Sequence, residues 1–231
     1  QQAIALAQEL GNRTAEGIST GNIANLYLEE GEYSLALEHY QEALKISREV
    51  GNQRGVAIGL GNVAKLHHAM DNHEKSLEFF EAALAAVRKT GEVRIEGLTL
   101  GNLGSLLYSQ GKLESAETHF KLAISICDKV LPPAAAYYRS LLALLRSDQG
   151  KSSEAREMLE AAQQQLKGSR QTEVGQLLCR RARVEFMAGE PNTAAEYLAR
   201  AETIAAELDA SPKSRLSQTI AQARAMLAGE Q

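Results

Sequence analysis

Hydrophobic and polar residues recur along this chain with a period of 40. Residues 11–50, 51–90 and 91–130 can be written one below another so that the same residue types fall in the same columns. A fixed period of this length indicates stacked structural repeats. The apolar residues of the second half of residues 11–50 lie mostly at helical spacing: Leu35, Leu37, Tyr40, Leu44 and Ile46. The pattern therefore predicts an all-α chain with two helices per repeat and no strands.

Turn residues mark where these helices begin and end. Asn12 is placed to cap a first helix that runs to about residue 30, and Gly31 is placed to end it. Glycine suits that position because it tolerates the left-handed backbone conformation that closes many helices. A second helix is expected over about residues 34–50, with Gly51 after it. Corresponding turn positions in the next repeats are Asp71, Gly91 and Gly111.

The period divides the chain into the segments of a single solenoid domain. We expect the following segments: 1–10, the second helix of a truncated repeat; 11–50, 51–90 and 91–130, three repeats; 131–169 and 170–209, two degenerate repeats; 210–231, a C-terminal capping helix. Because residues 1–10 align with residues 41–50, their apolar residues Ile4, Leu6 and Leu10 should be exposed. The chain is therefore expected to be a fragment of a longer protein.

Small residues recur where two helices must cross closely. The columns contain Ala24, Ala36 and Ala43, then Ala64, Ser76 and Ala83, then Gly104, Ala116 and Ala123, with Tyr40, Phe80 and Phe120 between them. This arrangement resembles the tetratricopeptide repeat. The Leu-Gly-Asn triads at 60–62 and 100–102, and Thr-Gly-Asn at 20–22, resemble the longer subclass found in the Leu-Gly-Asn-repeat spindle-orientation scaffold, kinesin light chain and many bacterial signalling proteins. The last two repeats depart from the pattern, since Arg146 and Glu185 replace Tyr27, His67 and Leu107.

The resemblance implies a right-handed superhelix whose first helices line a concave, partner-binding groove. Asn22, Asn62 and Asn102 form one column there, and in related repeats an asparagine at this place bonds the backbone of an extended peptide. A primary amide suits that role because it donates and accepts hydrogen bonds at once. The alternative is that these amides satisfy backbone groups inside the stack, although their mid-helix position is not explained by capping.

Further groove candidates come from neighbouring columns: Asn25, Lys65, His68 and Tyr108. Arg54 and Arg94 lie near the starts of first helices. They could hold acidic side chains of a ligand or the C-terminal carbonyls of the preceding helix, and both interpretations stay open. Arg180, Arg181 and Arg183 are interpreted as a solvated or salt-bridged face.

Composition narrows the function classes. A net charge of −4 and a pI near 5.8 give no reason to expect nucleic acid or an anionic membrane as partner. No apolar run is long enough for membrane insertion. Cys127 and Cys179 are interpreted as reduced, buried residues, which favours a cytoplasmic location. No metal is expected at His67, His68 and His73, because adjacent histidines point about 100° apart on a helix.

No cofactor or catalytic site is expected, since the chain has no phosphate loop, nucleophile elbow or zinc-protease helix. The favoured function is a protein- or peptide-binding scaffold. One alternative is a regulatory sensor arm of a signalling or transcription protein, which would bind a small molecule or a short peptide. Another is self-assembly, in which the groove or the apolar face of the truncated repeat at residues 1–10 would hold a second copy of the chain.

Overall fold

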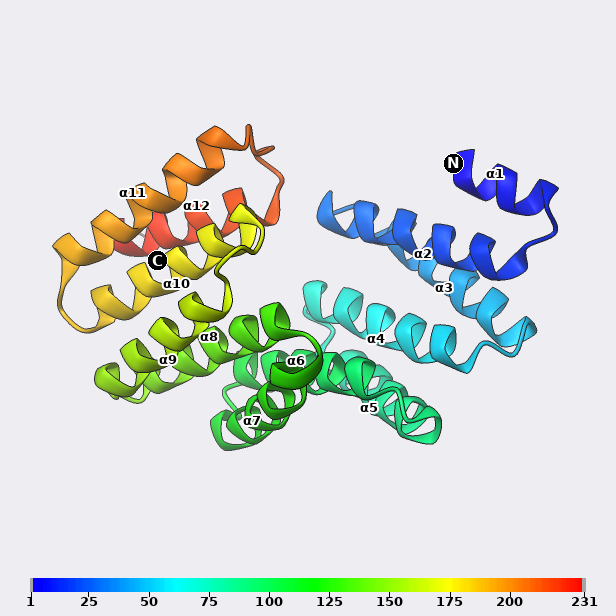
Figure 1. Ribbon diagram of the computed structural model, residues 1–231, viewed down its shortest axis with the longest axis horizontal. Helices are drawn as coiled ribbons and strands as arrows, with labels where there is room; N and C mark the ends of the chain where they lie inside the picture. The colour runs from blue at the N-terminus through cyan, green and yellow to red at the C-terminus, as the bar shows by residue number, and fades with distance from the viewer. Residues whose placement is uncertain (1, 230–231) are drawn as a thin grey trace. The chain divides into compact units, whose positions relative to one another are not determined.

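The computed structural model describes residues 2–229, which form twelve helices and, within that range, no strand (Figure 1). The helices, in chain order, are α1 (Gln2–Glu9), α2 (Arg13–Glu29), α3 (Tyr33–Glu49), α4 (Gln53–Ala69), α5 (His73–Thr90), α6 (Val93–Ser109), α7 (Leu113–Val130), α8 (Pro132–Asp148), α9 (Ser152–Gln165), α10 (Gln171–Met187), α11 (Pro191–Glu207) and α12 (Arg215–Ala228). The prediction of an all-α solenoid of helix pairs is confirmed. Within the described range, no helix combines the length and the apolar character needed to cross a membrane.

The helix ends follow the residue chemistry. The Asn12 side chain accepts a hydrogen bond of 3.0 Å from the Ala15 amide, and Asn52 accepts one of 2.9 Å from the Gly55 amide. Each bond satisfies a backbone donor that the first helical turn leaves without a partner. Gly31 closes α2 with a φ of +77°, a left-handed conformation that costs glycine little. Asp71 adopts the same conformation with a φ of +55° after α4.

The chain forms two compact units, Gln1–Leu106 and Leu107–Gln231. In the first unit, α2 packs with α3 and α4 with α5, and α3 also packs on α4. Its core includes Ala24, Ala36, Tyr40, Val63 and Leu66, and the two alanines are fully buried. The small residues therefore sit at the predicted close crossings. Helix α1 buries Ala7 and leaves Leu6 exposed, and Leu10, directly after the helix, is also exposed, as the sequence predicts. Ile4, which was expected to be exposed as well, is half-buried.

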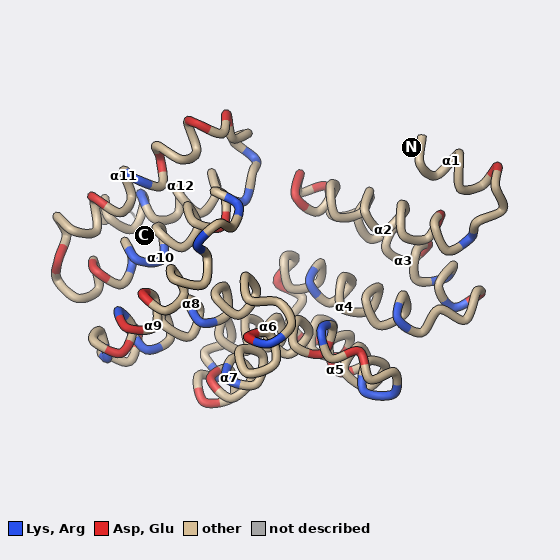
Figure 2. Tube along the Cα trace, in the orientation of Figure 1, with Lys and Arg blue, Asp and Glu red and all other residues tan. Residues whose placement is uncertain are grey.

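In the second unit, α10 packs against α8, α9, α11 and α12. One core cluster lies between α8, α9 and α10 and includes Ala143, Leu159 and Leu177. The other lies between α10, α11 and α12, where Leu216 and Ile220 of α12 are buried. Through these residues α12 covers the apolar faces of α10 and α11. Lysine and arginine positions lie among aspartate and glutamate positions in both units (Figure 2).

Candidate functional site

The three asparagines of the predicted column lie in the middle of first helices of the first unit. Asn22 is exposed in α2, and Asn62 and Asn102 are half-buried in α4 and α6. Within the part of the chain that the structure describes, the side chains of Asn22 and Asn62 make no hydrogen bond, whereas Asn102 has a partner. Their position distinguishes them from the capping residues Asn12 and Asn52. At least two amides of the column thus keep their full hydrogen-bonding capacity.

Apolar side chains lie one helical turn before each asparagine of the column. Ile18 is 59% exposed and Ile58 is 42% exposed, while Leu98 at the same register is half-buried. Residues four apart share one face of a helix, so each isoleucine and its asparagine face the same way. A β-carbon added to Gly61, directly before Asn62, would meet no atom within 4 Å. Helices α2 and α4 therefore present exposed apolar and amide groups side by side, with open space beside Gly61.

Asn25, the next candidate, is engaged inside the first unit. The Tyr40 hydroxyl is buried and donates a hydrogen bond of 2.7 Å to Asn25 Oδ1. Burial raises the pKa of Tyr40, and the charge of Glu29 raises it further. The neutral phenol is therefore the donor at any physiological pH, and it uses one of the two lone pairs of the Asn25 oxygen. The amide nitrogen and the second lone pair of Asn25 remain for a ligand.

The histidines pack against aromatic rings. His67 is stacked on Phe79 with ring centroids 5.5 Å apart, and His68 lies 5.8 Å from His73 with tilted rings. Burial lowers the pKa of both His67 and His68. The charge of Lys75 lowers the pKa of His67 further, and the charge of His73 lowers the pKa of His68 further. Among the described residues there is no cluster of three or more side chains that could hold a metal ion.

The remaining basic candidates of the first unit differ in their partners. Arg54 lies 3.7 Å from Glu92, the residue just before α6, so a carboxylate of the chain itself compensates part of its charge. Lys65 is half-buried and has a partner. Arg94 is exposed, and no ion pair joins it to any residue between 2 and 229. The structure thus favours neither of the two roles considered for Arg54.

Tyr108, in the last turn of α6, belongs to the second unit. Its hydroxyl donates to Asp148, and Arg183 of α10 lies 3.1 Å from the same carboxylate. Burial raises the pKa of Tyr108, and the bond to Asp148 raises it further. Within the second unit, Tyr108 is therefore linked to α8 and α10. Its ring remains half-buried and part of the surface.

Sequence reasoning missed one cluster, which consists of Tyr137, Arg180 and Arg215 in α8, α10 and α12. The guanidinium carbons of Arg180 and Arg215 lie 4.7 and 5.0 Å from the centre of the Tyr137 ring. The arginine run of α10 was interpreted as a solvated or salt-bridged face, which holds for Arg181 and Arg183. The signal was in the repeat register, because Arg180 lies nine positions before the turn residue Gly189, as Asn102 does before Gly111.

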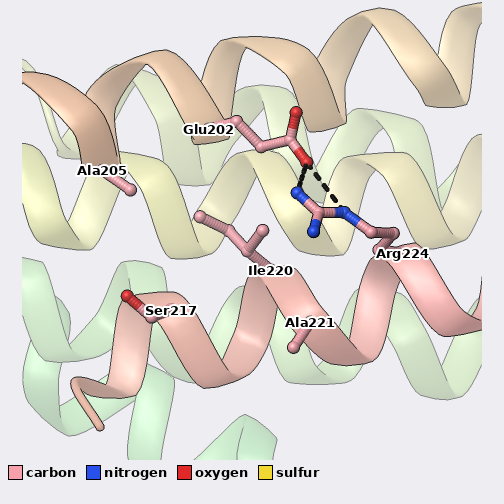
Figure 3. Close-up of a pocket in the computed structure, with 6 residues that line it drawn as sticks. All are labelled: Glu202, Ala205, Ser217, Ile220, Ala221 and Arg224. Atoms are coloured by element: carbon pink, nitrogen blue, oxygen red, sulfur yellow. Dashed lines mark hydrogen bonds and ion pairs between the residues drawn. The ribbon is translucent and has the colours of Figure 1, made fainter. Parts of the chain in front are cut away.

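A hollow of about 250 Å³ lies between α11 and α12. It is lined by Glu202, Ala205, Ser217, Ile220, Ala221 and Arg224 (Figure 3). Glu202 accepts hydrogen bonds of 2.5 and 3.2 Å from Arg224, so the two charges of the hollow neutralise each other. The rest of its lining is small or apolar, and it offers no chemistry that selects a ligand.

Parts of the sequence match models of one protein family. The family model for the tetratricopeptide repeat matches residues 21–49 and 55–129. No curated protein matches the sequence.

Solved structures resemble most of the chain, 84–96% of it, at low sequence identity. BtubC (BKLC) from P. vanneervenii is 20% identical over 91% of this chain and 89% of its own, with a TM-score of 0.72. The kinesin light chain TPR-like repeats of Podosopora anserina are 20% identical over 84% and 96% of the two chains, with a TM-score of 0.61. A Rap protein complexed with Competence and Sporulation Factor is 18% identical over 96% and 66%, with a TM-score of 0.70.

These similarities agree with the buried small residues, the glycine turns and the Leu-Gly-Asn triads described above. The fold is that of a protein-interaction scaffold, in which stacked helix pairs offer an extended binding surface. The chain contains tetratricopeptide repeats at residues 21–49 and 55–129, and its fold resembles that of the kinesin light chain TPR-like repeats.

Proposed function

We propose that this scaffold binds an extended peptide segment of a partner along the first helices of residues 1–106. The observation that carries the proposal is the pair of amides on α2 and α4. Asn22 and Asn62 are in register, lie in mid-helix, and make no hydrogen bond to any residue of the described range. Each stands one turn after a partly exposed isoleucine, Ile18 or Ile58.

The spacing suits a peptide backbone. Helices α2 and α4 are in contact, and packed helices lie roughly 8–10 Å apart. An extended chain advances about 3.3 Å per residue, so one asparagine per repeat would meet roughly every third residue. Each amide can donate to a peptide carbonyl and accept from a peptide N–H. Recognition of this kind depends on the backbone, and it therefore tolerates different side chains on the ligand.

The surroundings indicate which side chains the ligand carries. Ile18 and Ile58 offer apolar contact, and the open space beside Gly61 allows close approach of a backbone. Arg54 is compensated by Glu92, which removes one cation that would select an acidic ligand. We therefore expect the segment bound by α2 and α4 to be neutral and partly apolar. The Rap protein complexed with Competence and Sporulation Factor is a structural neighbour that supports a ligand on this fold.

The test starts from a library of displayed twelve-residue peptides, selected against the whole chain. Enriched peptides are then measured by fluorescence polarisation against the wild type, the double variant Asn22→Ala/Asn62→Ala, and the control Asn72→Ala. Asn72 is an exposed asparagine just before the second helix α5. We expect the double variant to bind about tenfold or more weakly, because each lost hydrogen bond costs about 1 kcal/mol.

Two outcomes would contradict the proposal. One is equal affinity of the double variant and the wild type, which would leave the amides without a role in binding. The other is a selection that enriches no peptide, which would favour a small-molecule sensor arm or self-assembly. Peptides with N-methylated backbone amides provide a further control, since recognition through the backbone predicts that they bind more weakly than their parents.

A further inference from the structure

The arginines of α10 differ in how their charge is compensated. Arg181 lies 3.0 Å from Glu160, and Arg183 lies 3.1 Å from Asp148. Arg180, the residue directly before Arg181, is half-buried and has no ion pair with any carboxylate of the described chain. Its guanidinium lies against the ring of Tyr137, with 4.7 Å between the guanidinium carbon and the ring centre.

Arg215, the first residue of α12, approaches the same ring. Its guanidinium carbon lies 5.0 Å from the ring centre, and its Nη2 donates a hydrogen bond of 2.5 Å to the Tyr137 hydroxyl. It too has no carboxylate partner among residues 2–229. The guanidinium groups of Arg180 and Arg215 therefore share the ring of Tyr137. Helices α8, α10 and α12, which carry the three residues, belong to the same unit.

The two positive charges are close enough to act on each other. Burial lowers the pKa of Arg180, Tyr137 raises it, and the charge of Arg215 lowers it again. Attraction between a cation and the face of an aromatic ring offsets part of the repulsion. A partly buried cation without a counter-ion is nevertheless unfavourable, so an anion that reaches both groups would be stabilised there.

The cluster is open to a ligand. Arg215 is exposed, and Arg180 and Tyr137 are half-buried, so all three reach the surface. Guanidinium groups bind carboxylates through two parallel hydrogen bonds, a geometry that a single ammonium group does not offer. Arg180 also occupies the register of the asparagine column, two repeats after Asn102. Two of the three residues, Tyr137 and Arg180, thus lie on first helices, the same class of helix that carries the amides of the first unit, and Arg215 joins them from the capping helix.

We propose that Arg180 and Arg215, arranged around Tyr137, form a carboxylate-binding site that holds an acidic side chain or the C-terminal carboxylate of a partner protein. The partner is a protein because the chain is an interaction scaffold. The site lies within residues 107–231 and does not require the binding of a peptide by α2 and α4. The side-chain and chain-end carboxylates share the same chemistry, and the experiment separates them.

The whole chain, labelled with ¹⁵N, is titrated while the Nε–Hε signals of its arginines are followed by NMR. N-acetylglutamate α-amide supplies only a side-chain carboxylate, and N-acetylalanine supplies only a chain end. N-acetylglutamine amide is the neutral control, and inorganic phosphate is the competing anion. We expect at least one carboxylate probe to shift the Arg180 and Arg215 signals saturably, while the neutral amide leaves them in place.

Variants assign the effect to the cluster. Arg180→Gln and Arg215→Gln are each expected to weaken the response about tenfold, because one charge-assisted pair is lost. Arg215 is exposed, so its variant keeps the test decisive if Arg180→Gln does not fold. Arg224→Gln is the matched control, since Arg224 lies on the same helix and is paired with Glu202. No saturable shift with either carboxylate, an unchanged response in Arg215→Gln, or tighter binding of phosphate would each overturn the proposal.

Discussion

Arg146 in α8 and Glu185 in α10 occupy equivalent positions in successive helix pairs, and each is paired with the residue 29 positions before it. Arg146 donates to Glu117 at 3.0 and 2.5 Å, and Glu185 accepts from Arg156 at 2.5 to 3.1 Å. The sign of the charge is reversed between the two pairs. Where the earlier repeats use packing side chains, these two repeats use an ion pair to the preceding second helix.

The pair in α9 and α10 is expected to contribute little net stability. Glu185 is 9% exposed and Arg156 is 43% exposed, so the arginine can turn to water when its partner is lost. Glu185→Gln should lower the free energy of unfolding by about 1 kcal/mol, because the charge-assisted bonds are weakened. The double variant Arg156→Leu/Glu185→Leu should be at least as stable as Glu185→Gln, since apolar packing often replaces an ion pair without loss.

Urea unfolding followed by circular dichroism measures both effects. Glu157→Gln, an exposed site of the same helix as Arg156, is the control and should change stability by less than about 0.5 kcal/mol. A double leucine variant less stable than Glu185→Gln would show that the ion pair contributes more than the apolar replacement.

Much of this fold could be predicted because its determinants are local. The capping asparagines Asn12 and Asn52, the glycine turns and the small residues at helix crossings all repeat with the period, and each acts on its own helix or the next one. The partners of Arg146 and Glu185 could not be predicted in this way. Their choice depends on which of several charged residues of the preceding helix is within reach.

The candidate site was only partly predictable for the same reason. The register places Asn22, Asn62 and Asn25 on first helices, but it does not reveal that Tyr40 donates a hydrogen bond to the oxygen of Asn25. The cluster at Tyr137 is harder still, because it unites single residues of three helices, and Arg215 lies outside the repeat pattern. The division into two units is also invisible, since the period continues through residue 106.

Replacing the asparagine at the start of α4 or the one in its middle by alanine should change the free energy of unfolding in opposite directions. Asn52→Ala removes the cap bond to the Gly55 amide and should cost about 1 kcal/mol of unfolding free energy. Asn62→Ala removes no internal hydrogen bond and introduces a better helix former, so it should raise the free energy of unfolding by about 0.5 kcal/mol. Urea unfolding of the two variants gives the comparison. A loss of stability in Asn62→Ala would assign that amide a structural role instead.

Two helical glycines offer a second matched pair. A β-carbon at Gly17 would lie 3.0 Å from Cγ2 of Ile46, which is buried and branched at its own β-carbon, so it has little freedom to move. Gly17→Ala should therefore destabilise the chain by about 1 kcal/mol or more. Gly61→Ala meets no atom within 4 Å and should stabilise α4 by about 0.5–1 kcal/mol. Thermal unfolding of both variants checks the sign, and stabilisation in both cases would contradict the packing argument.

The two cysteines should be unreactive in the folded chain. Cys127 is fully shielded from solvent and Cys179 is 2% exposed. Burial raises the pKa of Cys179 to about 11, so almost none of it is thiolate at neutral pH. A thiol reagent such as dithionitrobenzoate should modify neither residue in buffer and both in urea. Rapid modification of the folded chain would show that one of the thiols is transiently exposed.

Stability should fall as the pH drops from 7.5 to 5.5, because His67 and His68 are more easily protonated in the unfolded chain. Burial lowers the pKa of both below the ordinary value of 6.5, so their contribution is fully present above that pH. As the pH falls below 6.5, the unfolded state binds more protons and the free energy of unfolding decreases. His67→Leu should show a shallower dependence, and the further change His68→Gln should reduce it again. Urea unfolding at several pH values gives the slopes, and NMR titration of the two rings gives their pKa values; a slope that both substitutions leave unchanged would place the acid sensitivity elsewhere.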